Sequence, residues 1–141
     1  MDQKNRNLNI LGLAQKAGLL AIGCDAAEAA ARKGMTKLII SASDASERAY
    51  RNARINADAC GALCLVVPFT KFELGSITGR GSPGTIAFLD TGLAVRFLQG
   101  LAEMQPDPFA KLWEFLEKSA EVRERDGMQA PQESPKRRTK Q

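Results

Sequence analysis

The sequence has 141 residues, of which 44% are hydrophobic and 26% are charged, so it suits a single soluble domain with an ordinary hydrophobic core. The longest apolar run, residues 62–67, ends at Pro68 and is too short to cross a bilayer, and Asn9, Gln15 and Lys16 interrupt the apolar stretch that a signal peptide needs; we therefore expect a cytoplasmic protein. The sequence contains no histidine, which excludes histidine-based catalytic triads and histidine metal ligands.

The surplus of positive charge lies in the first hundred residues. The net charge is +4; residues 1–100 carry 12 basic and 8 acidic side chains, whereas residues 101–141 carry 8 of each. A modest basic surplus fits a polyanionic partner without proving one. It places any anion-binding surface in the N-terminal part of the chain.

Three cysteines, Cys24, Cys60 and Cys64, leave at least one thiol unpaired in a monomer. An odd number without a secretion signal predicts reduced thiols. Cys60 and Cys64 are four residues apart, but with no histidine and one further cysteine they make a poor zinc set. We interpret all three as buried small apolar side chains and expect no cofactor.

Helices and strands are predicted to alternate along residues 7–101. Apolar residues at helical spacing predict the helices, and short apolar runs bounded by glycine or proline predict the strands. In chain order the predicted elements are helix 7–17, strand 19–22, helix 25–33, strand 37–41, helix 44–60, strand 63–67, helix 71–77, strand 85–89 and helix 91–101. Strict alternation predicts an α/β sandwich with a central, partly parallel sheet covered on both faces.

Glycines and acidic residues mark the predicted helix ends. A glycine follows four of the helices and is placed to end each of them. These glycines are Gly18, Gly34, Gly61 and Gly79. Asp25 with Glu28, and Asp44 with Glu47, have the spacing of a capping box, so each aspartate is predicted to begin a helix.

Two segments follow the alternating part. Residues 106–123 have an amphipathic pattern and predict one added helix, which we expect to dock on the domain, on a second copy of the chain or on a protein partner. Its apolar face is made of Phe109, Leu112, Trp113, Leu116 and Ala120. Residues 127–141 combine prolines with a basic end and predict a disordered tail. The predicted organisation is a domain over residues 1–103, an added helix over residues 104–126 and the tail.

Residues 79–84 read Gly-Arg-Gly-Ser-Pro-Gly and match the letters of a dinucleotide-binding motif. That motif must follow a strand and open a helix, so that the pyrophosphate sits on the helix N-terminus. Here the glycines follow a helix and lead into a strand, and Pro83 removes one backbone donor. We interpret the segment as a connecting loop that is able to meet a partner. The sequence also lacks a P-loop motif.

Three arginines on the predicted helix 44–60 are candidates for binding phosphates. Arg48, Arg51 and Arg54 are spaced three residues apart and form either a basic ridge or a solvated helix face offset by acidic neighbours. One tyrosine and one tryptophan argue against an aromatic platform for single-stranded RNA.

A second candidate surface involves the start of the alanine-rich helix. We expect Gly23, Lys33, Lys37 and the loop 80–84 to meet at one edge of the sheet. A helix N-terminus offers free N–H groups to phosphate, and glycines allow a close approach of the RNA backbone. Asp25 and Glu28 oppose this interpretation because they place negative charge at the same helix end.

An ordered set of motifs resembles the L-seven-Ae / L-thirty-e ribosomal protein family, in its bacterial YlxQ-like branch. The matching residues are 11–18 (LGLAQKAG), Gly23, 37–44 (KLIISASD), 73–75 (ELG) with Gly79, 85–88 (TIAF) and 92–94 (GLA). The resemblance implies a three-layer α/β/α sandwich with a mixed four-stranded sheet. It also implies a non-enzymatic protein that binds structured RNA, typically kink-turns, in translation or on ribosomal RNA. The family's binding surface corresponds to residues 23–33 and 82–85.

The sequence departs from the family's Gly-x-Asn-Glu-x-x-Lys motif at three positions, although Gly23 matches. Asp25, Ala26 and Ala29 stand where the family has Asn, Glu and Lys, so base-reading groups and a cation are missing. This predicts general RNA binding rather than kink-turn specificity. The candidate RNA-binding residues are Gly23, Cys24, Asp25, Ala26, Ala29, Arg32, Lys33, Lys37, Ser82, Pro83, Gly84 and Thr85.

Two other functions remain as alternatives. The altered motif and the helix that carries Trp113 are compatible with a protein-interaction or regulatory module on the same fold. A small enzyme that uses Ser43, Asp44 and a thiol is the weaker alternative, because a helix cap and a core explain these residues better.

Overall fold

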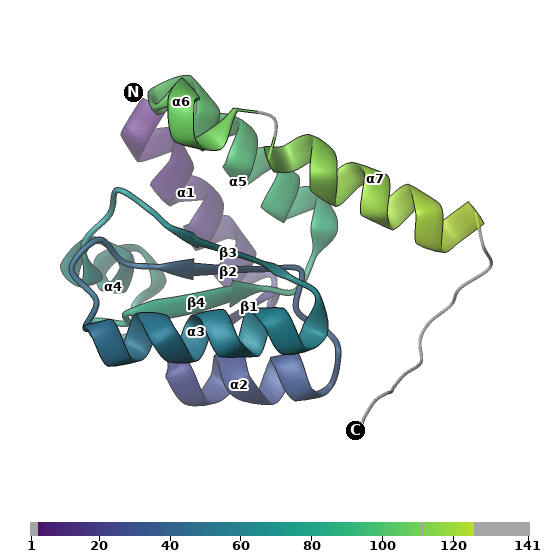
Figure 1. The fold of residues 1–141 in the computed structure, drawn as a ribbon. Coiled ribbons are helices and arrows are strands. Elements are labelled where there is room, and N and C mark those ends of the chain that lie inside the picture. The colour runs from purple at the N-terminus through teal and green to yellow at the C-terminus, as the bar shows by residue number, and fades with distance from the viewer. Residues whose placement is uncertain (1–2, 111, 126–141) are drawn as a thin grey trace.

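The computed structural model describes residues 3–110 and 112–125, in which helices and strands alternate around one sheet (Figure 1). The helices are α1 (Gln3–Lys16), α2 (Cys24–Arg32), α3 (Glu47–Cys60), α4 (Lys71–Thr78), α5 (Thr91–Met104), α6 (Pro106–Phe109) and α7 (Leu112–Arg125). The strands are β1 (Leu20–Ile22), β2 (Leu38–Ser41), β3 (Leu63–Val66) and β4 (Thr85–Phe88). Within these described ranges no helix has the length and apolar character needed to span a membrane. The predicted tail, residues 127–141, lies outside them.

The four strands form a single mixed sheet in the order β1-β4-β2-β3. Strand β4 runs antiparallel to both β1 and β2, whereas β2 and β3 are parallel. Thr85 pairs with Ser41, and Ile86 pairs with Ile22. The start of β4 therefore lies beside the ends of both β1 and β2, and this arrangement positions the candidate site.

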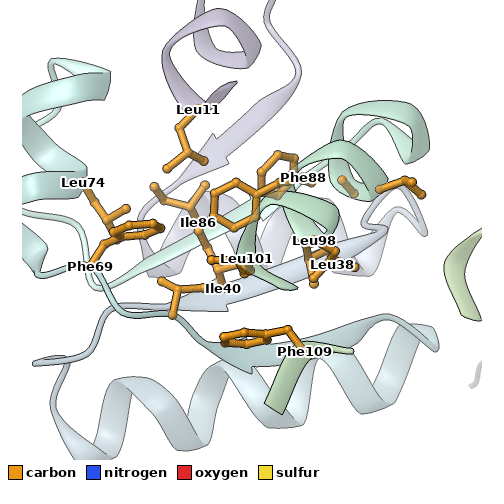
Figure 2. Packing of buried hydrophobic residues seen from close by; sticks show 14 of the residues in the cluster. Leu11, Leu38, Ile40, Phe69, Leu74, Ile86, Phe88, Leu98, Leu101 and Phe109 are labelled. Carbon is orange, nitrogen blue, oxygen red and sulfur yellow. The ribbon is translucent and has the colours of Figure 1, made fainter. Parts of the chain in front are cut away.

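The sheet is covered by helices on both faces, so the predicted α/β/α sandwich is confirmed (Figure 1). Successive side chains of a strand point to opposite faces. Large residues of β2 and β4 pack with α1 and α5, and Figure 2 shows this main core. Fully buried members of it include Leu11, Leu38, Ile40, Ile86, Phe88, Leu98 and Leu101.

The opposite face of the sheet carries a layer of alanines. Ala27 of α2 and Ala57 of α3 pack with Ala87 of β4 and Ile39 of β2 in a second buried cluster. Because alanine side chains are small, the two helices are able to lie close to the strands and to each other. Alanine also favours the helical conformation of α2.

The C-terminal segment contains two helices, so the prediction of one continuous helix over residues 106–123 is wrong. Helix α6 ends at Ala110, whose backbone (φ −59°, ψ 124°) has left the helical region. Phe109 and Leu116 are buried in the main core, and Trp113 packs partly buried against it. The expectation that the segment docks on its own domain is confirmed for these residues, while Ala120 lies outside the described side chains.

The two predicted aspartate caps are wrong. Helix α2 begins after Gly23, which has no side chain to cap it, and Asp25 lies inside its first turn. Helix α3 begins after Ser46, whose hydroxyl accepts a hydrogen bond from the Ala49 N–H at 3.1 Å. Asp44 instead accepts from the N–H of Lys71, which is distant in the sequence.

Candidate nucleic-acid interface

The start of α2 is joined directly to the first residue of β4, which follows the glycine-rich loop. The Gly23 N–H donates a hydrogen bond to the Thr85 carbonyl oxygen at 2.8 Å, and the Cys24 thiol lies 3.6 Å from the Thr85 hydroxyl. On the other side of the loop, the Ala42 N–H donates to the Gly84 carbonyl oxygen at 2.9 Å. The two segments that the sequence assigned to RNA binding are therefore neighbours.

Gly23 is the residue that makes this junction possible. Its backbone has φ 99° and ψ 161°, a region that is essentially restricted to glycine. This conformation turns the chain from β1 into α2, and no capping side chain accepts a hydrogen bond from the helix start. The first N–H groups of a helix have no partner within the helix. The exposed residues of this first turn are Cys24, Asp25 and Ala26.

At this end of the sheet, the face that carries the alanine cluster ends in two hydroxyl side chains. Ser41 and Thr85 are paired across β2 and β4, and both are almost completely buried. Thr85 accepts from the Cys24 thiol, whereas the Ser41 hydroxyl has no hydrogen-bond partner among the described residues. The base of the α2 start is thus polar, a feature that the apolar pattern of β2 did not predict.

The starts of α3 and α4 border the same end of the sheet. A Cβ atom built on Gly84 would lie 3.4 Å from Cβ of Ala45 and 3.8 Å from Cδ of Lys71, so the loop touches both. The Ser43 N–H donates to the Phe69 carbonyl oxygen at 2.9 Å, which ties the turn before α3 to the turn before α4. We call residues 23–26, 43–45, 71–72 and 82–85 the rim site.

Sequence reasoning missed Lys71 and Phe72, which it treated only as part of a short helix. Lys71 forms no ion pair with a described residue, and its N–H is held by Asp44 at 2.8 Å. Phe72 is 75% exposed. The sequence feature that could have identified them is a phenylalanine next to a lysine, outside the face of the helix that Leu74 and Thr78 bury.

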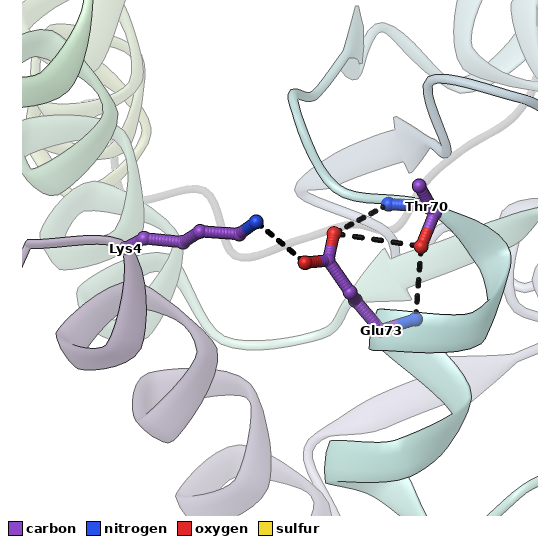
Figure 3. A network of polar contacts seen from close by, with 3 residues as sticks. All are labelled: Lys4, Thr70 and Glu73. Atoms are coloured by element: carbon purple, nitrogen blue, oxygen red, sulfur yellow. Dashed lines mark hydrogen bonds and ion pairs between the residues drawn. The ribbon is translucent and has the colours of Figure 1, made fainter.

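Helix α4 is held in place by a complete capping box (Figure 3). The Glu73 N–H donates to the Thr70 hydroxyl at 3.1 Å, and the Glu73 carboxylate accepts from the Thr70 N–H at 2.9 Å. The same carboxylate pairs with the Lys4 ammonium of α1. The hydrogen bonds from Lys4 and from the Thr70 backbone lower the pKa of Glu73. Residues from two helices thus fix the first turn of α4.

The loop 79–84 lies directly on α4. Gly79 ends the helix in the left-handed conformation (φ 73°), as predicted. A Cβ atom on Gly75 would lie 1.5 Å from the carbonyl oxygen of Gly81, so only glycine permits this crossing. Ser82 is exposed and Pro83 is buried, which presents the middle of the loop to solvent beside the start of α2.

Three of the predicted binding residues lie away from this edge. The Lys37 N–H donates to the Phe88 carbonyl oxygen, at the end of β4 opposite Thr85. Arg32 and Lys33 are at the last turn of α2, and Arg32 pairs with Glu28 at 2.8 Å. The expectation that Lys33 and Lys37 meet Gly23 and the loop at one edge is therefore wrong, because the length of α2 separates Lys33 from Gly23 and Lys37 precedes β2 at the end of the sheet opposite Thr85.

The arginines of α3 are only partly available as cations. Arg51 pairs with Glu47 at 3.6 Å, and Arg54 lies 4.0 Å from Asp58. Both pairs are exposed, and such pairs contribute little energy. Arg48, in the first turn of α3, forms no ion pair with a described residue and is exposed. The free positive charge of α3 is thus at its start, next to the rim site.

The prediction that all three cysteines are buried is wrong for Cys24. Its side chain is exposed in the first turn of α2, whereas Cys60 and Cys64 are half-buried. Burial raises the pKa of the Cys64 thiol, with a smaller opposing effect from Arg54 and a further increase from Asp58. Only Cys24 of the three lies in the rim site.

Comparisons with known proteins identify the fold. No protein-family model matches the sequence, and no curated protein matches it. A solved structure of a Bacillus halodurans protein of unknown function superposes with a TM-score of 0.61 at 24% identity, covering 67% of this chain and 95% of the other. A Giardia lamblia 15.5kD RNA binding protein superposes with a TM-score of 0.56 at 13% identity, covering 73% of this chain and 88% of the other. This chain therefore shares its fold with a known RNA-binding protein.

Proposed function

We propose that this protein is a non-catalytic RNA-binding protein that recognises structured RNA such as ribosomal RNA through the rim site and acts in translation or on the ribosome. The observation that carries the proposal is the hydrogen bond from Gly23 to Thr85, which places the start of α2 beside the first residue of β4, directly after the glycine-rich loop. The shared fold with an RNA-binding protein supports it, and the family resemblance motivates the link to translation.

The chemistry of the rim site suits a phosphate backbone. Backbone N–H groups at the start of α2 are donors to phosphate oxygens, and the helix dipole favours negative charge there. Glycines 23 and 84 have no side chain to hold an RNA strand away. Lys71 and Arg48 provide cations at the border, while Asp25 opposes them. Affinity is therefore expected to be moderate and strongly dependent on salt.

The finer proposal concerns specificity. Asp25, Ala26 and Ala29 are all exposed on α2, at the positions where the resembling family carries its base-reading residues and a lysine. Alanine has no group that forms hydrogen bonds with a base edge. We therefore propose recognition of RNA shape and backbone, with kink-turn binding weakened or lost.

The test is a titration of structured RNAs, including ribosomal RNA fragments and a kink-turn, by gel shift at several salt concentrations. Lys71→Gln is expected to weaken binding and to reduce the salt slope by about one phosphate contact. Lys33→Gln is the matched control, because it removes the same charge at the far end of α2. Absence of wild-type binding at low salt would refute the proposal, and equal losses in both variants would refute the position of the site.

A further inference from the structure

Phe72 has the largest exposed fraction of all the large apolar residues whose burial the structure describes. It is 75% exposed, compared with 58% for Leu13 and Ile55 and 55% for Phe115. Single exposed apolar residues are common and need no function on their own. The position and the rigidity of Phe72 are what distinguish it.

The backbone beneath Phe72 is fixed from both sides. The preceding residue, Lys71, donates its N–H to the Asp44 carboxylate, and the following residue, Glu73, closes the capping box with Thr70 and pairs with Lys4 (Figure 3). Three parts of the chain thus hold the first turn of α4. A ring carried on a preorganised turn loses little conformational freedom when a partner binds to it.

Phe72 also belongs to the rim site by its neighbours. The side chain of Lys71 lies against Gly84, and Gly84 is hydrogen-bonded to Ala42 at the end of β2. The ring thus projects from the element that borders the glycine-rich loop, on the same end of the sheet as the start of α2. An aromatic ring next to a lysine combines a stacking surface with a charge for the adjoining phosphate.

We propose that Phe72 stacks on an unpaired base of the bound RNA while Lys71 binds the phosphate beside that base. This inference rests on the proposed RNA-binding function and names a contact of the same site. Unstacked bases in loops and bulges are the parts of structured RNA that aromatic side chains reach. A single ring suits one such base, which agrees with the scarcity of tyrosine and tryptophan in this sequence. An RNA base is favoured over an apolar protein partner because the chain neighbours of Phe72, Lys71 and Glu73, are both charged.

The experiment measures the affinity of the full chain for a short RNA duplex interrupted by a bulge, with 2-aminopurine in the bulge. Phe72→Ala is expected to weaken binding about 5- to 100-fold, since stacking on one aromatic side chain has that effect. Phe72→Trp is expected to retain affinity. The fluorescence of 2-aminopurine is expected to change on binding of the wild type and not on binding of Phe72→Ala.

Phe115→Ala is the matched control, because it removes an exposed phenylalanine from α7, away from the α4 end of the sheet (Figure 1). Circular dichroism checks that each variant is folded. Unchanged affinity of a folded Phe72→Ala, or an equal loss in Phe115→Ala, would overturn the stacking proposal while the RNA-binding function stands. An effect of Phe72→Ala on protein capture with unchanged RNA affinity would also overturn it. Absence of wild-type binding at low salt would overturn both.

Discussion

Replacing Gly75 by alanine tests how far the position of the loop 79–84 governs the rim site. The new Cβ would lie 1.5 Å from the carbonyl oxygen of Gly81 and 2.6 Å from its carbonyl carbon. Contacts of this kind stay above 3.0 Å in proteins, so the loop has to move away from α4 by about 1.5 Å. Because the obstructing atoms belong to the backbone, no side-chain rotation relieves the contact.

The expected loss of stability follows from two opposing contributions. Overpacking of a buried position costs about 1–3 kcal/mol, and a clash with backbone places Gly75 at the upper end of that range. Alanine regains about 1 kcal/mol over glycine inside a helix. The net change is a loss of about 2 kcal/mol, which lowers the Tm by roughly 5–10 °C in a domain of this size.

The assay combines thermal unfolding, followed by Trp113 fluorescence and circular dichroism, with the RNA titration at a temperature where the variant is folded. Gly12→Ala is the matched control, because its Cβ would meet the Ile77 side chain at 3.3 Å and the Ile77 carbonyl oxygen only at an ordinary contact distance of 3.6 Å. We expect Gly12→Ala to leave RNA affinity unchanged and Gly75→Ala to weaken it about tenfold, since each displaced contact is worth about 1–3 kcal/mol. A Gly75→Ala variant with wild-type Tm and wild-type RNA affinity would refute the reasoning.

Three further predictions concern single side chains. Asp25→Asn removes a carboxylate from the start of α2 and is expected to tighten RNA binding by about fivefold at low salt, with the gain fading as salt is raised in the same gel shift. Glu73→Ala is expected to cost about 1 kcal/mol at neutral pH in urea unfolding. Because the pKa of Glu73 is lowered in the folded protein, its contribution is present above its ordinary value of 4.5 and is lost as the pH falls below it, so wild type and variant converge in acid. In timed alkylation read by mass spectrometry, exposed Cys24 is expected to react before Cys64, whose raised pKa delays its reaction to higher pH, and bound RNA is expected to slow Cys24 alone; equal rates, or no protection, would contradict the placement of the site.

Local sequence patterns were sufficient to predict most helices and strands of the fold. The predicted strand 37–41 contains the apolar run Leu38–Ile40 and is followed by a polar turn, and the buried strand β2 forms over Leu38–Ser41. Gly61 and Gly79 end α3 and α4 in the left-handed conformation, as their positions indicated. These features depend on interactions between residues close in the chain, which a sequence pattern records.

The errors arose where distant residues compete for the same group. Asp44 has the spacing of an N-cap for α3, but its carboxylate accepts a hydrogen bond from the Lys71 N–H. The N-cap of α3 is instead Ser46. Nothing in the local pattern records that choice. The break between α6 and α7 also depends on distant residues. The chain leaves the helical conformation at Ala110, and Phe109 and Leu116, on either side of this break, are both buried in the main core.

The candidate site was predicted in part for the same reason. The start of α2 and residues 82–85 were predicted to be neighbours, and the hydrogen bond between Gly23 and Thr85 confirms this contact for Thr85. Lys37 was misplaced because the direction of β4 is not encoded in its own residues. Phe72 was overlooked because the predicted helix 71–77 was treated only as a structural element, without considering which of its side chains are exposed.

The alanine layer beneath α2 has a consequence for how this protein is able to evolve. Ala27 and Ala87 are buried where α2 packs on the sheet, Ala57 of α3 joins the same cluster, and none of the three belongs to the rim site. A single added methyl group in this layer would lift or tilt the whole helix, and its first turn would be carried along. Substitutions at these interior positions would therefore shift the start of α2, and with it the geometry of the rim site, without changing any residue of that site.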